Sequence, residues 1–294
     1  MLPIPRIQHG QTALNRATTQ SEATRLHPHS ADGVIELLQI TDTHLFAGAE
    51  ADLLGIAPWH SCRAVVDAIL EDDSPRDLIL ATGDLSQDHS PESYRQFTRL
   101  MAELAPPVFW LPGNHDDAPV MQAELDAAGI SNAKQLLCGN WQILLLDTQL
   151  RGAVHGELAA EQLELLERAI NDYPRHHLLV AVHHQAVPVG CAWLDQHNLR
   201  NAGELKQRLA RHRAAKVVLF GHVHQGFDEV HDGVRYLASP STCIQFKPLS
   251  DDFALDHTAP GWRALSLYPD GRLSTQVWRL PPDAFVPDFS ATGY

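Results

Sequence analysis

The segment Ile35–His44, with the sequence IELLQITDTH, joins a short apolar run to a polar end. The run Ile35–Ile40 has the length and composition of a β-strand that is buried on both faces. Asp42 and His44 follow it directly, and two side chains in one tight turn after a strand can reach the same metal ion. Taken alone, such a triplet is more often a turn with a solvated histidine. The other apolar runs must therefore decide between the two interpretations.

Four further apolar runs end in polar residues in the same way. Leu78–Ala81, Val108–Leu111, Leu178–Val182 and Val217–Phe220 lead into Gly83-Asp84, Gly113-Asn114-His115-Asp116, His183-His184 and Gly221-His222-Val223-His224, respectively. In open α/β sheets the carboxyl ends of the strands form the ligand crevice, so we expect these polar residues to converge. Gly-Asp is commonly only a turn, and H-x-H occurs on strands by chance. Five such ends in succession nevertheless favour one shared site.

The remaining elements predict an α/β fold. Amphipathic stretches separate the apolar runs, among them Trp59–Leu70, Glu92–Leu104, Ala159–Ile170 and Glu204–Arg211. This alternation is typical of parallel strands joined by helices. After Gly221 the pattern changes to two hairpins, over residues 226–238 and 263–278, each with an Asp-Gly turn. Parallel strands followed by antiparallel ones indicate two sheets.

Composition limits the partners and the compartment. With 22 Lys and Arg against 36 Asp and Glu, the 294-residue chain has a formal charge of −14 and would repel nucleic acid over most of its surface. No stretch approaches the roughly 20 apolar residues of a membrane-spanning helix, so we expect neither nucleic acid nor membrane as a partner. The four cysteines contain no C-x-x-C pair, which predicts a reducing compartment, the cytoplasm.

The two ends of the chain are predicted to lie outside the folded domain. Residues 1–33 show neither helical nor strand periodicity and are predicted to be a disordered leader. Pro3 and Pro5 interrupt their longest apolar stretch, which argues against a secretory signal, and an organelle transit peptide is the alternative. The folded domain is predicted over residues 34–280, followed by a C-terminal tail over residues 281–294.

The donor types at the strand ends predict the kind of metal. Carboxylate and imidazole ligands without thiolate suit manganese, iron, cobalt or zinc rather than an iron–sulfur cluster or a structural zinc site. One aspartate has two oxygens and can bridge two ions, and an asparagine adds an oxygen ligand without adding charge. We therefore expect two divalent metal ions, with Fe²⁺/Fe³⁺ or Mn²⁺ preferred and Zn²⁺ or Co²⁺ as alternatives.

The motifs D-x-H, G-D, G-N-H-D and G-H-x-H, in this order between Leu37 and Gln225, resemble the calcineurin-type metallophosphoesterase superfamily. The resemblance implies an α/β fold built as a four-layer α/β/β/α sandwich with two mixed sheets. It implies a first metal bound by Asp42, His44 and His224, a second bound by Asn114, His183 and His222, and Asp84 as the bridge. It also implies that His115 is catalytic, acting on the leaving oxygen, and that Asp116 orients it.

A narrower resemblance, to the bacterial class III cyclic-AMP phosphodiesterases, covers almost the whole chain after residue 33. The segments that carry it are residues 38–46, 193–197, 199–202, 239–248 and 259–263. It implies hydrolysis of 3′,5′-cyclic AMP to 5′-AMP, which lowers cellular cyclic AMP. The substrate contacts expected from it are His44, Asp84, Asn114, His115, His183, His224, Arg200 and Asn201.

Several residues in these segments have plainer interpretations. Asn201 could serve only as the cap of the helix that follows it, and Arg200 could pair with a surface carboxylate. Trp193 and Phe246 are more often packing residues than nucleobase stackers. His184 follows His183 on a strand and should point to the opposite face, so we leave it out of the metal site.

Other functions compete with this hypothesis. A glycerophosphodiesterase, a 2′,3′-cyclic nucleotide phosphodiesterase or a protein phosphatase would use the same metal ligands. Purple acid phosphatases are disfavoured because they place a tyrosine ligand three residues after the bridging aspartate, where this chain has Gln87. Non-catalytic scaffolds of this superfamily typically lose ligands, whereas all seven ligand positions and His115 are present here. The sequence makes no prediction of the oligomeric state.

Overall fold

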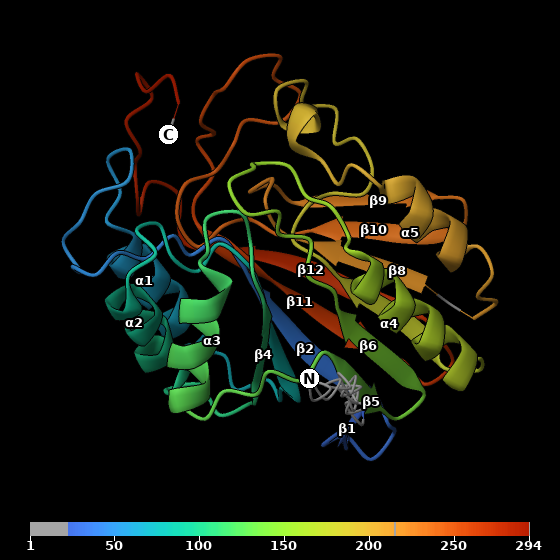
Figure 1. Cartoon of the computed structure of the whole chain (residues 1–294). Helices are drawn as coiled ribbons and strands as arrows, with labels where there is room; N and C mark the ends of the chain where they lie inside the picture. Colours follow the sequence, from blue (N-terminus) through green and yellow to red (C-terminus); the bar gives the residue numbers. More distant parts are fainter. Residues whose placement is uncertain (1–22, 215, 294) are drawn as a thin grey trace, which may run out of the picture.

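The structure, a computed structural model, describes residues 23–214 and 216–293 and contains two facing β-sheets with helices on their outer sides (Figure 1). The five-stranded sheet has the order β12-β11-β2-β3-β4, and the seven-stranded sheet has the order β1-β5-β6-β7-β8-β10-β9. Both sheets mix parallel with antiparallel pairs. The four-layer α/β/β/α sandwich with two mixed sheets is thus confirmed.

Most strands and helices begin and end within a few residues of the predicted apolar runs and amphipathic stretches. The five-stranded sheet contains β2 (Ile35–Ile40), β3 (Leu78–Thr82), β4 (Val108–Leu111), β11 (Gly261–Leu267) and β12 (Leu273–Arg279). The seven-stranded sheet contains β1 (Thr24–Leu26), β5 (Gln135–Cys138), β6 (Trp141–Leu145), β7 (His177–Ala181), β8 (Lys216–Phe220), β9 (Phe227–His231) and β10 (Val234–Ala238). The helices are α1 (Pro58–Glu71), α2 (Pro91–Met101), α3 (Ala118–Ala127), α4 (Ala160–Asp172) and α5 (Ala202–Leu209), with a 3-10 helix at Leu194–His197. Within the described ranges, none of these helices has the length and apolar character needed to cross a membrane.

Alternation along the central strands divides the core into three apolar layers. In β2, Ile35 and Leu37 belong to the layer between the two sheets, whereas Leu38 and Ile40 belong to the layer under α1, α2 and α3. Helices α4 and α5 cover the outer face of the seven-stranded sheet and form the third layer. Because successive strand residues point to opposite faces, a strand between two apolar layers is apolar at most of its positions, with Glu36 and Gln39 as the exceptions in β2. This explains the continuous apolar runs.

Some elements differ from the sequence patterns. Strand β1 lies inside residues 1–33 and pairs in parallel with β5, so the prediction of a disordered leader is wrong for residues 24–26, and residues 1–22 lie outside the described residues. A short edge strand is held by hydrogen bonds to the backbone of its neighbour. It therefore does not need the apolar run by which a strand is recognised in a sequence. Helix α3 buries only Met121 and Leu125, which is too few for an amphipathic pattern. Its start is marked by Asp117, whose carboxylate accepts a hydrogen bond from the Val120 N–H at 3.2 Å.

Arg263 of β11 fastens the two sheets together. Its side chain is buried, and its guanidinium donates to the carbonyl oxygens of Ala238 in β10 and Phe227 in β9, at 2.6 and 3.0 Å from Nη2. It also donates to Thr275 Oγ1 of β12 at 3.0 Å. Burial lowers the pKa of the guanidinium to about 10. The contacts join β9 and β10 of one sheet to β11 and β12 of the other.

Arg263→Met should therefore destabilise the fold. The change leaves carbonyls of both β9 and β10 without a buried donor, and each such group costs about 1–3 kcal/mol. We expect the free energy of unfolding, measured by urea denaturation, to fall by roughly 2–4 kcal/mol. The matched control is Arg272→Met, because Arg272 lies at the surface, where it pairs with the exposed Asp270 and stacks on the ring of Tyr268. An equal loss in the two variants would contradict the role of Arg263 as a bridge between sheets.

Candidate metal centre

The strand ends that carry the candidate ligands come together. Asp42, Asp84 and Asn114 follow β2, β3 and β4, which are neighbours in one sheet, and His183 and His222 follow the neighbouring strands β7 and β8 of the other. Hydrogen bonds join the two sets across the sheets. The His222 backbone N–H donates to the two carboxylate oxygens of Asp42 at 3.1 and 3.2 Å, and His183 Nδ1 lies 2.8 Å from the carbonyl oxygen of Thr82.

Asp42, His44 and His224 form a first group. His224 Nε2 lies 3.3 Å from Asp42 Oδ1 and 3.2 Å from His44 Nε2. All three side chains are fully buried. Two imidazole nitrogens and a carboxylate oxygen this close together are a set of donors that can bind one divalent cation.

Asp84, Asn114 and His183 form a second group beside the first. His183 Nε2 lies 3.2 Å from Asp84 Oδ2 and 3.1 Å from Asn114 Oδ1. Asp84 Oδ2 is also 3.9 Å from His44 Nε2 of the first group. Asp84 therefore stands between the two groups, in the position expected of a bridging carboxylate.

His222 completes the set and tests whether a metal fits. Its ring lies against that of His183, with 5.1 Å between ring centroids, and His183, His184 and His222 each offer a nitrogen within 4.8 Å of the other two. The Nε2 atom of His222 is buried and has no hydrogen-bond partner among the described residues. Burying a polar atom without a partner is costly. A nitrogen lone pair that nothing else satisfies, in a cluster of carboxylate, amide and imidazole donors, fits a metal ion.

The backbone at these ligands is unusual. Five of the seven candidate ligands have a positive φ, namely Asp42 (54°), His44 (46°), Asp84 (52°), His222 (66°) and His224 (49°). A non-glycine residue in this left-handed region is uncommon and strained, and such residues cluster at functional sites. The strain indicates that the conformation of these turns is set by the need to direct the candidate ligand side chains toward one another.

Gly83 and Gly113 make the close approach of the strand ends possible. Gly83 has a φ of 94°, and a Cβ atom there would lie 2.5 Å from His183 Nδ1 and 2.7 Å from the Gly113 backbone nitrogen. A Cβ atom on Gly113 would collide with the carboxylate of Asp84. Any side chain at either position would push the Asp84 and Asn114 turns apart.

Gly83→Ala should thus disrupt the centre more than the fold. The strand before Gly83 is buried and apolar, whereas its Cβ would strike His183 directly. We expect the variant to retain secondary structure by circular dichroism but to bind less than half of the wild-type metal, measured by mass spectrometry. Gly129→Ala is the control, because a Cβ at that other positive-φ glycine meets no atom within 4 Å. Equal metal content in the two variants would refute this reading of Gly83.

His115 lies at the edge of the first group. Its backbone N–H donates to Asp84 Oδ1 at 2.8 Å, and its ring lies edge-on to that of His44, with 5.1 Å between centroids. Burial lowers the pKa of the His115 imidazole, and the Asp84 carboxylate opposes this shift. The arrangement places an imidazole beside the candidate ligands, and its catalytic role stays a prediction.

Asp116 has a set of partners different from the expected one. Its carboxylate accepts backbone N–H groups from Leu85 at 3.0 Å, Ser86 at 3.1 Å and Gly113 at 2.8 Å. Burial raises the pKa of Asp116 to about 7, and the nearby Asp84 carboxylate adds to the shift. These contacts tie the turn after β3 to the turn after β4. They favour a role in holding Asp84 and Asn114 in place.

Arg200 and Asn201 do not join the cluster. The Arg200 side chain is exposed and donates to the carbonyl oxygen of Gln196 at 2.9 Å. Asn201 uses its side chain to accept from the Leu158 N–H and donate to the Leu158 carbonyl, both at 2.9 Å. Asn201 is the N-cap residue of α5, and its side chain makes no cap bond to the helix backbone but bonds to Leu158, which is a structural role. Their contacts give no support to substrate binding, which stays a prediction.

His184 and the aromatic residues also take defined places. The His184 ring packs against those of His183 and His222, but its Nδ1 lies 2.8 Å from Thr148 Oγ1 and its Nε2 lies 3.1 Å from the Val154 carbonyl. Both nitrogens thus have protein partners. Phe246 is buried and stacks on His224, with 4.2 Å between centroids and 13° between planes, and Trp193 packs edge-on against Phe246. Both are packing residues here.

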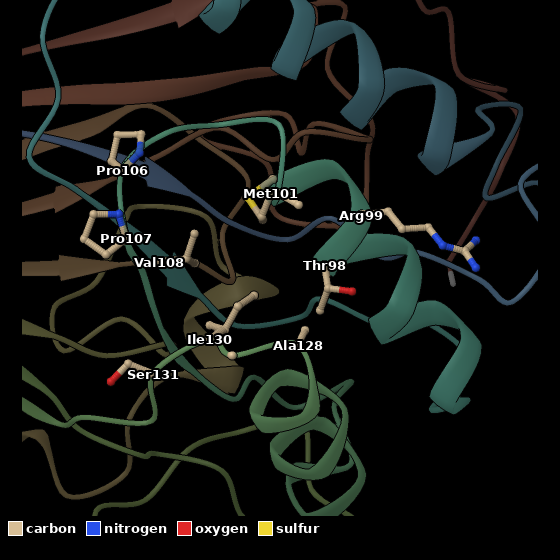
Figure 2. Close-up of a pocket in the computed structure, with 11 residues that line it drawn as sticks. Thr98, Arg99, Met101, Pro106, Pro107, Val108, Ala128, Ile130 and Ser131 are labelled. Carbon is tan, nitrogen blue, oxygen red and sulfur yellow. The ribbon is translucent and has the colours of Figure 1, made fainter.

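The cavity of about 400 Å³ shown in Figure 2 is remote from this centre. It is lined by the ends of α2 and α3 and by Pro106, Pro107 and Val108, at the amino end of β4. The candidate ligand Asn114 follows the carboxyl end of the same strand. The cavity and the candidate ligands therefore lie at opposite ends of β4.

The fold and the cluster at the strand ends define a class of enzyme, the metal-dependent phosphoesterases. The chain belongs to the calcineurin-like phosphoesterase family, whose sequence model matches residues 35–226. This family uses a dinuclear metal site, and the buried Asp and His groups described above are candidate ligands for it.

Cyclic-nucleotide phosphodiesterases are among the relatives. The chain is 50% identical over 268 residues to the 3′,5′-cyclic adenosine monophosphate phosphodiesterase CpdA of Escherichia coli K12, which covers 91% of this chain and 98% of that protein. It is 44% identical over 266 residues to CpdA of Pseudomonas aeruginosa, covering 90% of this chain and 97% of that protein. Among solved structures, a dimetal phosphatase from Danio rerio has the same fold, with a TM-score of 0.58, 13% identity, and coverage of 84% of this chain and 99% of that one.

Asp84→Ala should bind less metal than a variant of any ligand at the edge of the cluster. One carboxylate stands between both groups, so its removal should release both ions, whereas His44→Ala should release mainly one. The measurement is the number of Mn²⁺ ions bound per chain after chelation and reconstitution. Asp88→Ala is the control, because that carboxylate binds the Ala47 N–H and lies outside the cluster. If Asp84→Ala kept two ions at wild-type affinity, Asp84 could not be the bridge.

Proposed function

We propose that this chain hydrolyses 3′,5′-cyclic AMP to 5′-AMP at a centre of two divalent metal ions, and thereby lowers cellular cyclic AMP. The observation that carries the proposal is the position of Asp84 between two groups of buried donors. The choice of substrate is supported by the relatives that share 44–50% identity over about nine-tenths of the chain. Outside the ligand motifs, the segments 193–202 and 239–248 support the same choice.

In this proposal each ligand has one role. Asp42, His44 and His224 hold the first ion, Asn114, His183 and His222 hold the second, and Asp84 binds both. Once bound, the two ions would polarise the phosphoryl oxygens and activate a water molecule for attack on phosphorus. The donor set favours iron or manganese, with zinc or cobalt as alternatives. The cytoplasm, which the cysteine pattern predicts, is the proposed compartment.

The protein groups orient the ester and deliver a proton. His115 stands beside the first group, anchored through its backbone N–H to Asp84, so its imidazole can carry a proton to the departing O3′ of the ribose. Asp116 keeps the Asp84 and Asn114 turns in register through its three backbone contacts. Because O3′ is a poor leaving group, this proton contributes to the rate of the chemical step.

The nearest competing activities are hydrolysis of glycerophosphodiesters and of 2′,3′-cyclic nucleotides. They would use the same metal ligands, so the cluster alone does not separate them. A catalytically inactive scaffold is disfavoured, because the candidate ligands lie together in buried groups and the His115 ring lies 5.1 Å from that of His44.

A substrate panel tests the proposal. The manganese-reconstituted enzyme should convert cyclic AMP to 5′-AMP faster than it hydrolyses cyclic GMP, 2′,3′-cyclic AMP or glycerophosphocholine. Exhaustive chelation should abolish the activity, and added Mn²⁺ or Fe²⁺ should restore it. Chromatography of the products provides the measurement. A protein that cleaves only glycerophosphodiesters would transfer the assignment to that activity, and full activity in excess chelator would rule out a metal-dependent mechanism.

His115→Ala should slow the reaction without releasing the metals. General acid catalysis typically contributes about 10²–10⁴-fold, so kcat for cyclic AMP should fall by about that factor. A nitrophenyl diester needs little protonation of its leaving group, so kcat for that substrate should fall much less. Metal content, measured on the same preparation, should stay at the wild-type value. Equal losses on the two substrates, or departure of one ion, would show that His115 acts in another way.

A further inference from the structure

We infer that Gln87 is a positioning residue that fixes the tautomer of His44 and thereby sets the affinity of the first metal position. The inference rests on the two-metal centre of the proposed function. Gln87 stands three residues after Asp84, is half-buried, and its amide Oε1 lies 2.7 Å from His44 Nδ1. It therefore contacts the side of the His44 ring that faces away from the cluster.

The three histidines of the two groups share one arrangement. Each directs Nε2 toward another ligand and Nδ1 toward an oxygen acceptor. His183 Nδ1 lies 2.8 Å from the Thr82 carbonyl, and His224 Nδ1 lies 2.9 Å from the Ile244 carbonyl. These two acceptors belong to the main chain, so no substitution removes them. The acceptor at His44 is the side chain of Gln87, which a single substitution can remove.

The tautomer matters because a metal binds a nitrogen lone pair. A neutral imidazole carries one proton, and an oxygen acceptor at Nδ1 holds the proton there and leaves Nε2 free to coordinate. His44 Nε2 lies 3.2 Å from His224 Nε2 and 3.9 Å from Asp84 Oδ2. A proton on that nitrogen would occupy the space between the donors of the first group.

The backbone presets the position of Gln87. The chain after β2 and the chain after β3 run side by side, with the His44 N–H donating to the Asp84 carbonyl at 2.9 Å and the Leu45 N–H donating to the Leu85 carbonyl at 3.0 Å. The Gln87 N–H then donates back to the Leu45 carbonyl at 2.8 Å. These backbone hydrogen bonds place the side chain of Gln87 beside Nδ1 of His44. The contact therefore follows from the register of the two turns.

The test compares Gln87→Leu, which removes the acceptor, with Gln87→Glu, which restores one. The matched control is Gln149→Leu, because Gln149 is also half-buried but donates to the Gly113 carbonyl, at 2.7 Å, on the side of the second group. Two readouts are used. Nitrogen-15 NMR of the metal-free proteins reports which His44 nitrogen carries the proton, with the signal assigned by its loss in His44→Asn. Calorimetric titration with Mn²⁺ reports the two binding steps.

In Gln87→Leu we expect a share of His44 with its proton on Nε2 and one Mn²⁺ step weakened by about 10–100-fold, as is typical when an outer partner of a metal ligand is lost. Gln87→Glu should restore both readouts, and Gln149→Leu should leave the His44 signal at its wild-type position. The inference is overturned if Gln87→Leu keeps the proton on Nδ1 and both affinities, if both steps weaken equally, or if Gln149→Leu gives the same change. Neither readout uses cyclic AMP, so a failure of the substrate assignment is seen separately.

Discussion

Buried negative charge is the constraint around which this molecule is built. Asp42, Asp84 and Asp116 are at most 6% exposed, and a carboxylate taken out of water is costly unless donors replace the water, a cost that appears at Asp116 as a pKa raised to about 7. Backbone N–H groups supply them, from His222 to Asp42, from His115 to Asp84, and from Leu85, Ser86 and Gly113 to Asp116. Burial raises the pKa of Asp84, but the imidazoles of His183 and His115 outweigh it and hold the pKa well below its usual value. The carboxyl ends of strands from both sheets must lie together for these donors and imidazoles to surround the same aspartates.

The strained backbone at the ligands follows from this requirement. Each non-glycine residue in the left-handed region costs about 1–3 kcal/mol, and five of the seven candidate ligands are in it. The ladder between the turns after β2 and β3 holds two of them, because Asp42 and His44 donate their N–H groups to Gly83 and Asp84. The free energy gained by burying the apolar layers on both sides of the strands offsets this strain. The backbone at the candidate metal centre is therefore less stable than an unstrained backbone would be, and the strain serves to position the ligand side chains.

The parts of the site that were predictable are those that lie at the end of a buried strand. An apolar run followed at once by Asp, Asn or His is visible in the sequence, and strand order then brings such ends together. Helix α3 and strand β1 were not predictable, because neither depends on a long apolar face. The contacts of Asp116 with Ser86 and of Asn201 with Leu158 could not be predicted either, because they join groups 30 and 43 residues apart, and no sequence pattern records such distances.

The family model ends at residue 226, yet the first metal group depends on residues beyond it. Ser241 Oγ donates to the Asp42 carbonyl at 2.6 Å, the Ile244 carbonyl contacts His224 Nδ1, and Phe246 covers one face of the His224 ring. One short segment thus contacts two of the three candidate ligands of that group, Asp42 and His224. This accounts for the resemblance of residues 239–248 to one kind of phosphodiesterase, although none of these residues is a proposed ligand. A shift of the Ile244 carbonyl or of the Phe246 ring would turn the His224 imidazole away from Asp42, so this segment sets the position of a candidate ligand although it lies outside the matched family region.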